Sequence, residues 1–346
     1  MDRRADLRDA AAVQLANCAD NGSPTWAALV QAMAERLDDA DPPMAVQLVL
    51  DDPQPALGSA VFLRLFGAVH RLALADESCP LRAWLPSTGG VVDVARAVPT
   101  FFDVVAERAE ALALDMQAGV QTNEVGRAAS LSAALHWIGG PVVLLEVGAS
   151  AGLNLWLDRF RVEAGAVAWG PPGSPVRLAG QFSSGRPPAG PVEIVERRGS
   201  DLNPLDAGNE GDRRLLRSFV WPEHHERRAR LDAAFSVAGP LTLDRADACS
   251  WLGSQLAALR PGASTVVMHS VVMPYLSRAE RDEVRAIISE AGERASASDG
   301  ARLAWLSFEP RGFDPDMHVV VSRWPEGDRT LVARSRAHGQ DVRWLV

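Results

Sequence analysis

The sequence predicts an α/β protein in which a Rossmann-like, seven-stranded and mostly parallel sheet follows a helical N-terminal domain. Residues 1–139 carry apolar stripes at helical spacing and contain no convincing strand. Residues 140–346 alternate short apolar runs with amphipathic segments, which is typical of a doubly wound sheet. The last two apolar runs flank a short turn, which predicts an antiparallel hairpin at one end of that sheet.

The helices of the N-terminal domain are predicted from caps and from apolar spacing. Ser23-Pro24 combines a capping side chain with a proline at the first helical position. Gly139-Gly140 is a typical stop for the last helix. A stripe at i, i+1, i+4 and i+5 predicts one buried helical face, formed by Val61, Phe62, Leu65, Phe66, Val69 and Leu72.

The strands of the second domain are predicted from short apolar runs that end at glycine, proline or a charge. Residues 142–147 form the first run, whose continuous apolar character indicates a strand buried on both faces. Residues 164–191 are rich in Gly and Pro and are predicted to be an inserted surface loop. The other predicted strands are 192–196, 241–243, 264–269, 302–308, 318–324 and 330–335.

Composition limits the classes of partner and location. The formal net charge of −9 over 346 residues argues against nucleic acid, because phosphate binding needs a basic surface. Three cysteines without CxxC spacing favour reduced thiols and a cytoplasmic location. The charged start lacks the apolar core of a signal peptide, and no run is long enough for a membrane span. We expect a small-molecule substrate, and the oligomeric state is left open.

The strongest motif follows the first predicted strand and supplies six candidate ligand-binding residues. Small residues at the carboxyl end of a parallel strand let a ligand approach the backbone closely. The GxGxxG dinucleotide fingerprint fits poorly, because Ser150 and Leu153 replace its second and third glycines. A nicotinamide-dependent oxidoreductase is therefore the least favoured enzyme. The candidates are Glu146, Gly148, Ala149, Ser150, Gly152 and Asn154.

This motif resembles the first motif of class I S-adenosylmethionine-dependent methyltransferases, acid-x-Gly-x-Gly-x-Gly. Glu146, Gly148 and Gly152 match, and Ser150 replaces the central glycine. The resemblance implies a methyltransferase-like sheet and S-adenosylmethionine as cofactor, with the glycine loop passing under its methionine and ribose parts. The alternative is a glycine-rich turn in an α/β fold that holds no cofactor.

Two acids after later strands extend the same resemblance. Asp201, with Asn203 beside it, stands where such enzymes place the acid that accepts hydrogen bonds from the ribose hydroxyls. Asp247-Ala248 stands where the family often has an Asp-Ala pair at the adenine. The alternative for Asp201 is an Asx turn, and the alternative for Asp247 is a helix cap.

His269 and Tyr275 are the catalytic candidates, because the end of the fourth strand faces the methyl group in methyltransferases. A histidine titrates near neutrality and can act as a general base, and Tyr275 is the only tyrosine in the chain. Met273-Pro274-Tyr275 resembles in part the Asn-Pro-Pro-Tyr signature of amine-directed methyltransferases, without its Asn and first Pro. A structural histidine is the alternative for His269.

Candidate substrate-binding residues come from two other segments. Residues 121–127 are dense in polar side chains, so Gln121, Asn123, Glu124 and Arg127 are expected to meet the acceptor, Arg127 through a carboxylate or phosphate. The alternative is a solvated helix start. Trp221 lines the pocket or packs in the core. The adjacent histidines at 224–225 point about 100° apart on a helix, so no metal site is predicted.

The whole chain resembles a bacterial family, domain of unknown function 2332 (DUF2332). The family brings no established reaction, so the leading expectation is methyl transfer to a small polar acceptor, and the alternative is a non-catalytic regulatory protein that binds S-adenosylmethionine or a nucleoside. The segments that carry the resemblance are QTNEVGR (121–127), LLEVGASAGLNL (144–155), RRGSDLNPLD (197–206), FVWPEHHERRARL (219–231), DRADACSWL (244–252) and TVVMHSVVMPYL (265–276).

Overall fold

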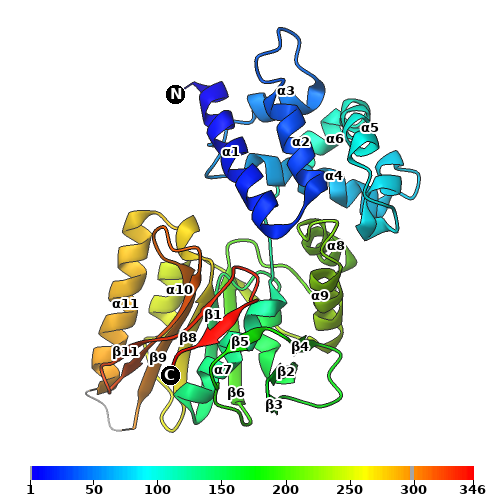
Figure 1. Ribbon diagram of the computed structural model, residues 1–346. Helices are drawn as coiled ribbons and strands as arrows, with labels where there is room; N and C mark the ends of the chain where they lie inside the picture. The colour runs from blue at the N-terminus through cyan, green and yellow to red at the C-terminus, as the bar shows by residue number, and fades with distance from the viewer. Residues whose placement is uncertain (1, 297–299) are drawn as a thin grey trace. The chain divides into compact units, whose positions relative to one another are not determined.

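A computed structural model describes residues 2–296 and 300–346 of the chain (Figure 1). Its internal contacts divide it into two compact units. The first unit comprises Met1–Thr122 and Glu210–Ala229, and the second comprises Asn123–Asn209 and Arg230–Val346. None of the helices in the described ranges is both long and apolar enough to cross a membrane.

The first unit is helical, and its helices bury an aromatic core. Ser23 caps α2 by accepting a hydrogen bond from the Trp26 amide at 3.4 Å, and Pro24 takes the first helical position, as predicted. Trp26 stacks on Phe66 with ring centroids 5.1 Å apart. Its helices are α1 (Arg3–Asn21), α2 (Pro24–Ala34), α3 (Met44–Asp51), α4 (Val61–Ala75), α5 (Val94–Glu107), α6 (Ala109–Asp115), α8 (Glu210–Ser218) and the start of α9 (His225–Val237), with 3-10 turns η1 (Pro80–Trp84) and η2 (Pro86–Thr88).

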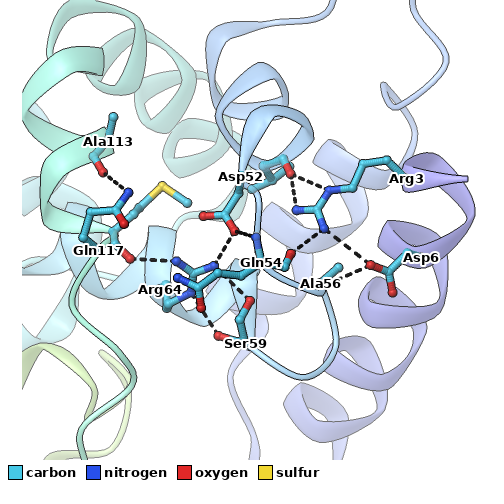
Figure 2. Close-up of polar contacts among 11 residues, drawn as sticks. Arg3, Asp6, Asp52, Gln54, Ala56, Ser59, Arg64, Ala113 and Gln117 are labelled. Carbon is cyan, nitrogen blue, oxygen red and sulfur yellow. Dashed lines mark hydrogen bonds and ion pairs between the residues drawn. The ribbon is translucent and has the colours of Figure 1, made fainter. Parts of the chain in front are cut away.

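A buried ion pair ties three helices of this unit together (Figure 2). Arg64 of α4 contacts Asp52, just after α3, at 2.8 Å, and both side chains are less than 5% exposed. Arg64 also donates to the Met116 carbonyl at 2.8 Å and to the Ser59 carbonyl at 3.0 Å. Because all three guanidinium nitrogens of Arg64 donate hydrogen bonds, part of the cost of burying the pair is offset.

The second unit is built on a nine-stranded sheet in the order β5-β12-β11-β10-β9-β8-β1-β6-β7. The consecutive pairs β9-β8, β8-β1, β1-β6 and β6-β7 are parallel. The pairs β9-β10, β10-β11 and β11-β12 are antiparallel. The bounds are β1 (Pro141–Val147), β5 (Phe182–Ser184), β6 (Glu193–Asp201), β7 (Leu243–Arg245), β8 (Ser264–Ser270), β9 (Arg302–Pro310), β10 (Met317–Trp324), β11 (Arg329–Ser335) and β12 (Val342–Trp344).

The prediction of a seven-stranded, mostly parallel sheet is therefore wrong in strand number and in how far the parallel part extends. The predicted hairpin is confirmed as β10 and β11, but β12 and β5 continue the sheet beyond it. Each added strand is three residues long, too short to show a period of two in the sequence.

Helices cover the sheet, and the period of two in β1 divides its side chains between the faces. Val143, Leu145 and Val147 pack into one core with α10 (Ala248–Gln255) and α11 (Arg278–Ser296). Glu146 therefore points to the opposite face of the sheet. The helix α7 (Ala128–Ile138) contacts strands β9, β10 and β11. The helices α10 and α11 lie together beside the strands in Figure 1.

The segment predicted as an inserted surface loop, residues 164–191, contains short strands. β3 (Val167–Trp169) and β4 (Arg177–Ala179) flank β2 (Arg161–Ala164) in a separate three-stranded sheet. β5 lies in the same segment and joins the edge of the large sheet beside β12. The Gly and Pro residues that suggested a loop occupy the turns between these strands.

Candidate functional site

The parallel strands of the second unit have a topological switch point. In chain order, β7, β6, β1, β8 and β9 are the third, second, first, fourth and fifth strands of the parallel part, so the connections leave β1 in one direction and return beyond it to β8. Ligands of open α/β sheets bind outside the carboxyl ends of the strands at such a point. The carboxyl ends of β1, β6 and β8 are therefore the candidate functional site.

The bend after β1 has a left-handed backbone at three alternating positions. Gly148, Ser150 and Gly152 have φ of 67°, 55° and 68°. Ser150, which replaces the central glycine of the motif, thus adopts a backbone conformation that glycine favours. This conformation is strained for other residues and persists only where neighbouring contacts hold the backbone in place. A Cβ on Gly148 would stand 2.5 Å from Cγ2 of Val272, so this glycine is needed for close packing against the turn after β8.

Hydrogen bonds from neighbouring segments fix this bend. The Ser150 amide donates to Oδ2 of Asp201 at 2.9 Å, and the Ser150 carbonyl accepts from the Leu205 amide at 2.9 Å. The amides of Ala149 and Leu153 donate to the Ser200 carbonyl and to Oδ1 of Asn123, respectively. These amides already donate to acceptors within the protein. A ligand here would therefore bind through side-chain oxygens and through van der Waals contact with the backbone.

Asp201 ends β6 beside this bend and also forms a local turn. Its Oδ1 accepts from the Asn203 amide at 2.8 Å, which is the Asx turn considered as the alternative. Both carboxylate oxygens of Asp201 thus accept backbone amides, one from Ser150 and one from Asn203. Asn203 is exposed, and its Oδ1 accepts from Arg245 at 2.8 Å.

Asp247 and Ala248 follow β7 and have the local roles of a helix start. Asp247 caps α10 by accepting from the Ser250 amide at 2.9 Å. Hydrogen bonds from the Ser250 side chain and then its amide lower the pKa of Asp247 below its usual range. Ala248 is buried in the core with α10 and α11. Asp247 therefore acts as the N-cap of α10 in this structure, and its contact with an adenine stays a prediction.

Glu146 is the most deeply buried acid of the site among the described residues. The residue is 2% exposed, and its Oε2 has no hydrogen-bond partner among the described residues. Burial raises the pKa of Glu146 well above its usual range, the negative charge of Asp201 raises it further, and the guanidinium of Arg127 lowers it. A buried carboxyl oxygen without a partner is costly unless a ligand supplies a donor or a positive charge.

Three of the predicted substrate residues lie against this end of the sheet. Asn123 bonds the bend through the Leu153 amide, and Arg127 donates to the Ser270 carbonyl at 3.2 Å. Oε2 of Glu124 lies 3.2 Å from Nδ1 of His338, and the Glu124 carbonyl lies 3.5 Å from Nδ2 of Asn154. Oδ1 of Asn154, itself 1% exposed, has no hydrogen-bond partner in the described part of the chain.

His269 belongs to a buried network that the sequence did not reveal. Nδ1 of His269 lies 2.7 Å from Oε1 of Glu309, and Nε2 accepts from the Trp305 indole at 2.9 Å. Because the indole can only donate, the ring is neutral with its hydrogen on Nδ1. Both ring nitrogens are thus engaged, which is the geometry of the structural alternative, so a general-base role for His269 requires one of these bonds to open.

Glu309 holds the turn after β8. Its Oε1 also accepts from the amides of Val272 and Met273 at 2.8 and 3.4 Å, while its Oε2 is buried without a hydrogen-bond partner among residues 2–296 and 300–346. Val271 in this turn has φ of 57°, a rare conformation for a β-branched residue. Such strain often accompanies functional sites, and here it lies beside the strained bend after β1.

Tyr275 lies on the surface beyond this turn. It ends the 3-10 turn η5 (Met273–Tyr275) and is 68% exposed. Its catalytic role stays a prediction.

Gln121 and Trp221 belong to the first unit, whereas the candidate site lies in the second. Trp221 packs in the helical core and stacks on His224 with ring centroids 5.2 Å apart. Both ring nitrogens of His224 are engaged, with the Asn21 carbonyl at 2.6 Å and Arg227 at 2.8 Å. Within the described residues, no three His, Cys, Asp or Glu side chains gather as a metal site.

One comparison with known proteins identifies relatives of the chain. A family model described as an uncharacterized protein conserved in bacteria (DUF2332) matches residues 8–344, nearly the whole chain. No curated protein matches the sequence significantly.

Proposed function

Because the chain belongs to the DUF2332 family, whose description names no reaction, we propose its function from the site: methyl transfer from S-adenosylmethionine to a small polar acceptor. The observation that carries the proposal is Glu146, a buried acid with an unpartnered Oε2, beneath a left-handed bend at the switch point. The second acid, Asp201, lies close enough to raise the pKa of Glu146.

The residues at this end of the sheet fit the groups that S-adenosylmethionine presents. The cofactor carries a positive ammonium group, a positive sulfonium centre and two ribose hydroxyls, and when bound it supplies an electrophilic methyl group. Glu146 would hold a cationic part, and Asp201 would accept from the ribose hydroxyls. Gly148 and Gly152 would let the nucleoside approach the backbone.

The chain's own contribution to methyl transfer would be positioning. Transfer to a nucleophile needs in-line alignment more than a catalytic acid or base. Asn154 Oδ1 and Glu309 Oε2 are the buried acceptors that would orient the polar group of the methyl acceptor. Arg127 would hold the end of β8 through Ser270, and His269 would hold Glu309.

A second candidate is a regulatory protein that binds S-adenosylmethionine or a nucleoside without turnover. The observation that favours it is His269, whose two ring nitrogens are both engaged and so offer no base to an acceptor that must lose a proton. Binding without methylation across a panel of amine, hydroxyl and carboxylate acceptors would support this candidate over the enzyme.

Calorimetry with S-adenosylmethionine and S-adenosylhomocysteine tests the shared premise. We expect saturable binding, weakened about tenfold or more in Asp201→Asn, because a charge-assisted hydrogen bond contributes about 1.5–3 kcal/mol. Asp282→Asn changes an exposed acid of α11 that pairs with Arg285, so it is the control and should bind as the wild type does. No binding of either compound by the folded wild-type chain at millimolar concentration would overturn the proposal.

A further inference from the structure

The second unit also contains a cavity, which is lined by residues other than those of the candidate site. Its volume is about 410 Å³, inside the range of small-molecule pockets. Its walls come from α7, from β2 and β3, from the 190–192 segment that leads into β6, and from the 3-10 segment η4 (Leu153–Arg159). Of these, α7 and the 190–192 segment lead into the amino ends of β1 and β6, whereas the candidate site lies at the carboxyl ends of these strands.

One wall carries a histidine nitrogen that the protein leaves without a partner. His136 Nδ1 lies 3.2 Å from the Pro188 carbonyl, which can only accept, so the hydrogen is on Nδ1. Nε2 is buried and has no hydrogen-bond partner in the described residues. Burial lowers the pKa of His136, and this outweighs the backbone hydrogen bonds of Pro188 and Gly190, which raise it. The ring is therefore neutral at pH 7, and the nitrogen without a hydrogen is an acceptor.

The charge of the cavity comes from Arg161. Asp158, the acid of the wall, is neutralised by a double contact with Arg197 at 2.9 and 3.1 Å. Arg161 lies 3.9 Å from Glu163, whose same oxygen pairs more closely with Arg177. Nη1 of Arg161 donates to the Gly170 carbonyl at 3.1 Å. The guanidinium of Arg161 is therefore the positive group of the wall, and it shares its carboxylate neighbour, Glu163, with Arg177.

The remaining walls are apolar or aromatic. Trp169 is 5% exposed, packs edge-on against His136 at 5.3 Å between centroids, and spends its indole hydrogen on Ser132. Leu157, Pro171 and Val192 complete the apolar lining. The cavity thus combines one cation, one neutral acceptor and an apolar surface.

We propose that this cavity binds a small carboxylic acid with an apolar body and a hydroxyl or N–H group. The carboxylate would pair with Arg161, whose planar fork matches it, and the hydroxyl or N–H would donate to Nε2 of His136. One guanidinium balances a single negative charge, so a monoanionic carboxylate fits better than a phosphate dianion. The ligand enters beside Ala168, which lines the cavity and is exposed.

The shared segment η4 gives this site a route to the candidate site. η4 begins directly after Gly152 of the bend, and its Leu157 and Asp158 line the cavity. Arg197 of β6 donates to the Leu155 carbonyl at 2.9 Å as well as to Asp158. The cavity and the bend are thus joined by one continuous segment that Arg197 holds to β6.

Ligand-observed NMR and calorimetry on the full chain test the proposal with three probes: 4-hydroxybenzoate, mandelate and indole-3-carboxylate. We expect at least one to bind saturably, and the uncharged amide of that probe to bind about tenfold or more weakly. Arg161→Met should weaken binding to a similar extent, and His136→Phe should weaken it too. Arg198→Met removes an exposed cation of β6 that does not line the cavity, so it is the control and should bind normally.

A further variant, Ala168→Phe, keeps the test valid if the other variants fold poorly. It replaces an exposed side chain, so the fold should persist while the added ring occupies the entrance and abolishes binding. The proposal is overturned if none of the three probes binds the folded wild-type chain at about 10 mM. It is equally overturned if a probe binds but Arg161→Met and Ala168→Phe both leave its affinity unchanged.

Discussion

Replacing Glu146 with glutamine separates its cost to folding from its use in binding. The change is nearly isosteric, keeps one carbonyl oxygen and removes the ionisable carboxyl. Because Glu146 is 2% exposed and its Oε2 has no hydrogen-bond partner in the described residues, the free protein gains little from the charge. A bound cation would use that charge in full. The substitution should therefore spare stability and reduce affinity.

The affinity loss follows from one charge-assisted contact. Such a contact is worth about 1.5–3 kcal/mol, and about 1.4 kcal/mol is a factor of ten. Glu146→Gln should thus bind S-adenosylmethionine about 10- to 150-fold more weakly than the wild type in calorimetry. Equal affinity, within about twofold, would refute the assignment of Glu146 to a cationic ligand.

The pH dependence of stability gives the same substitution an independent readout. The pKa of Glu146 is raised in the folded state, so the wild type has no penalty below the usual value of 4.5 and loses stability as pH rises above it. Glu146→Gln has no such group. Urea unfolding should therefore find the two proteins similar at pH 4.5 and the variant more stable at pH 7. A variant that is less stable throughout would show that the carboxyl is satisfied inside the protein.

Two further substitutions test the packing that supports the fold and the bend. Arg64→Ala should lower the free energy of unfolding by about 3–5 kcal/mol in urea, because it leaves the Asp52 charge buried and unpaired; a loss below about 1 kcal/mol would contradict this. Gly148→Ala should destabilise more than Gly140→Ala, since both have positive φ but only Gly148 faces Val272 within 4 Å. Equal losses of the two alanine variants would show that Val272 moves aside freely.

The local patterns of the sequence predicted the strands and the bend well. The apolar run of β1, its small-residue bend and the hairpin β10–β11 are all encoded within a few consecutive residues. The capping of α2 by Ser23 is equally local. Elements of this kind depend on backbone preferences and on the alternation of apolar residues, which a single sequence displays.

The missed features depend on residues that are distant in the chain. Glu309 binds the turn after β8 only because β9 pairs with β8 and brings their carboxyl ends together. β12 forms by pairing with β11, and its three residues carry no pattern of their own. The left-handed backbone of Ser150 follows from its bonds to Asp201 and Leu205, which no local preference of serine indicates.

A crystal structure of the chain grown with S-adenosylhomocysteine tests the central claim most directly. We predict the nucleoside over the Gly148–Gly152 bend, with ribose oxygens within hydrogen-bond distance of Asp201 and the amino-acid part turned toward Glu146. An adenosyl group found only elsewhere, including the cavity beside His136, or no bound nucleoside at a saturating concentration, would contradict the account.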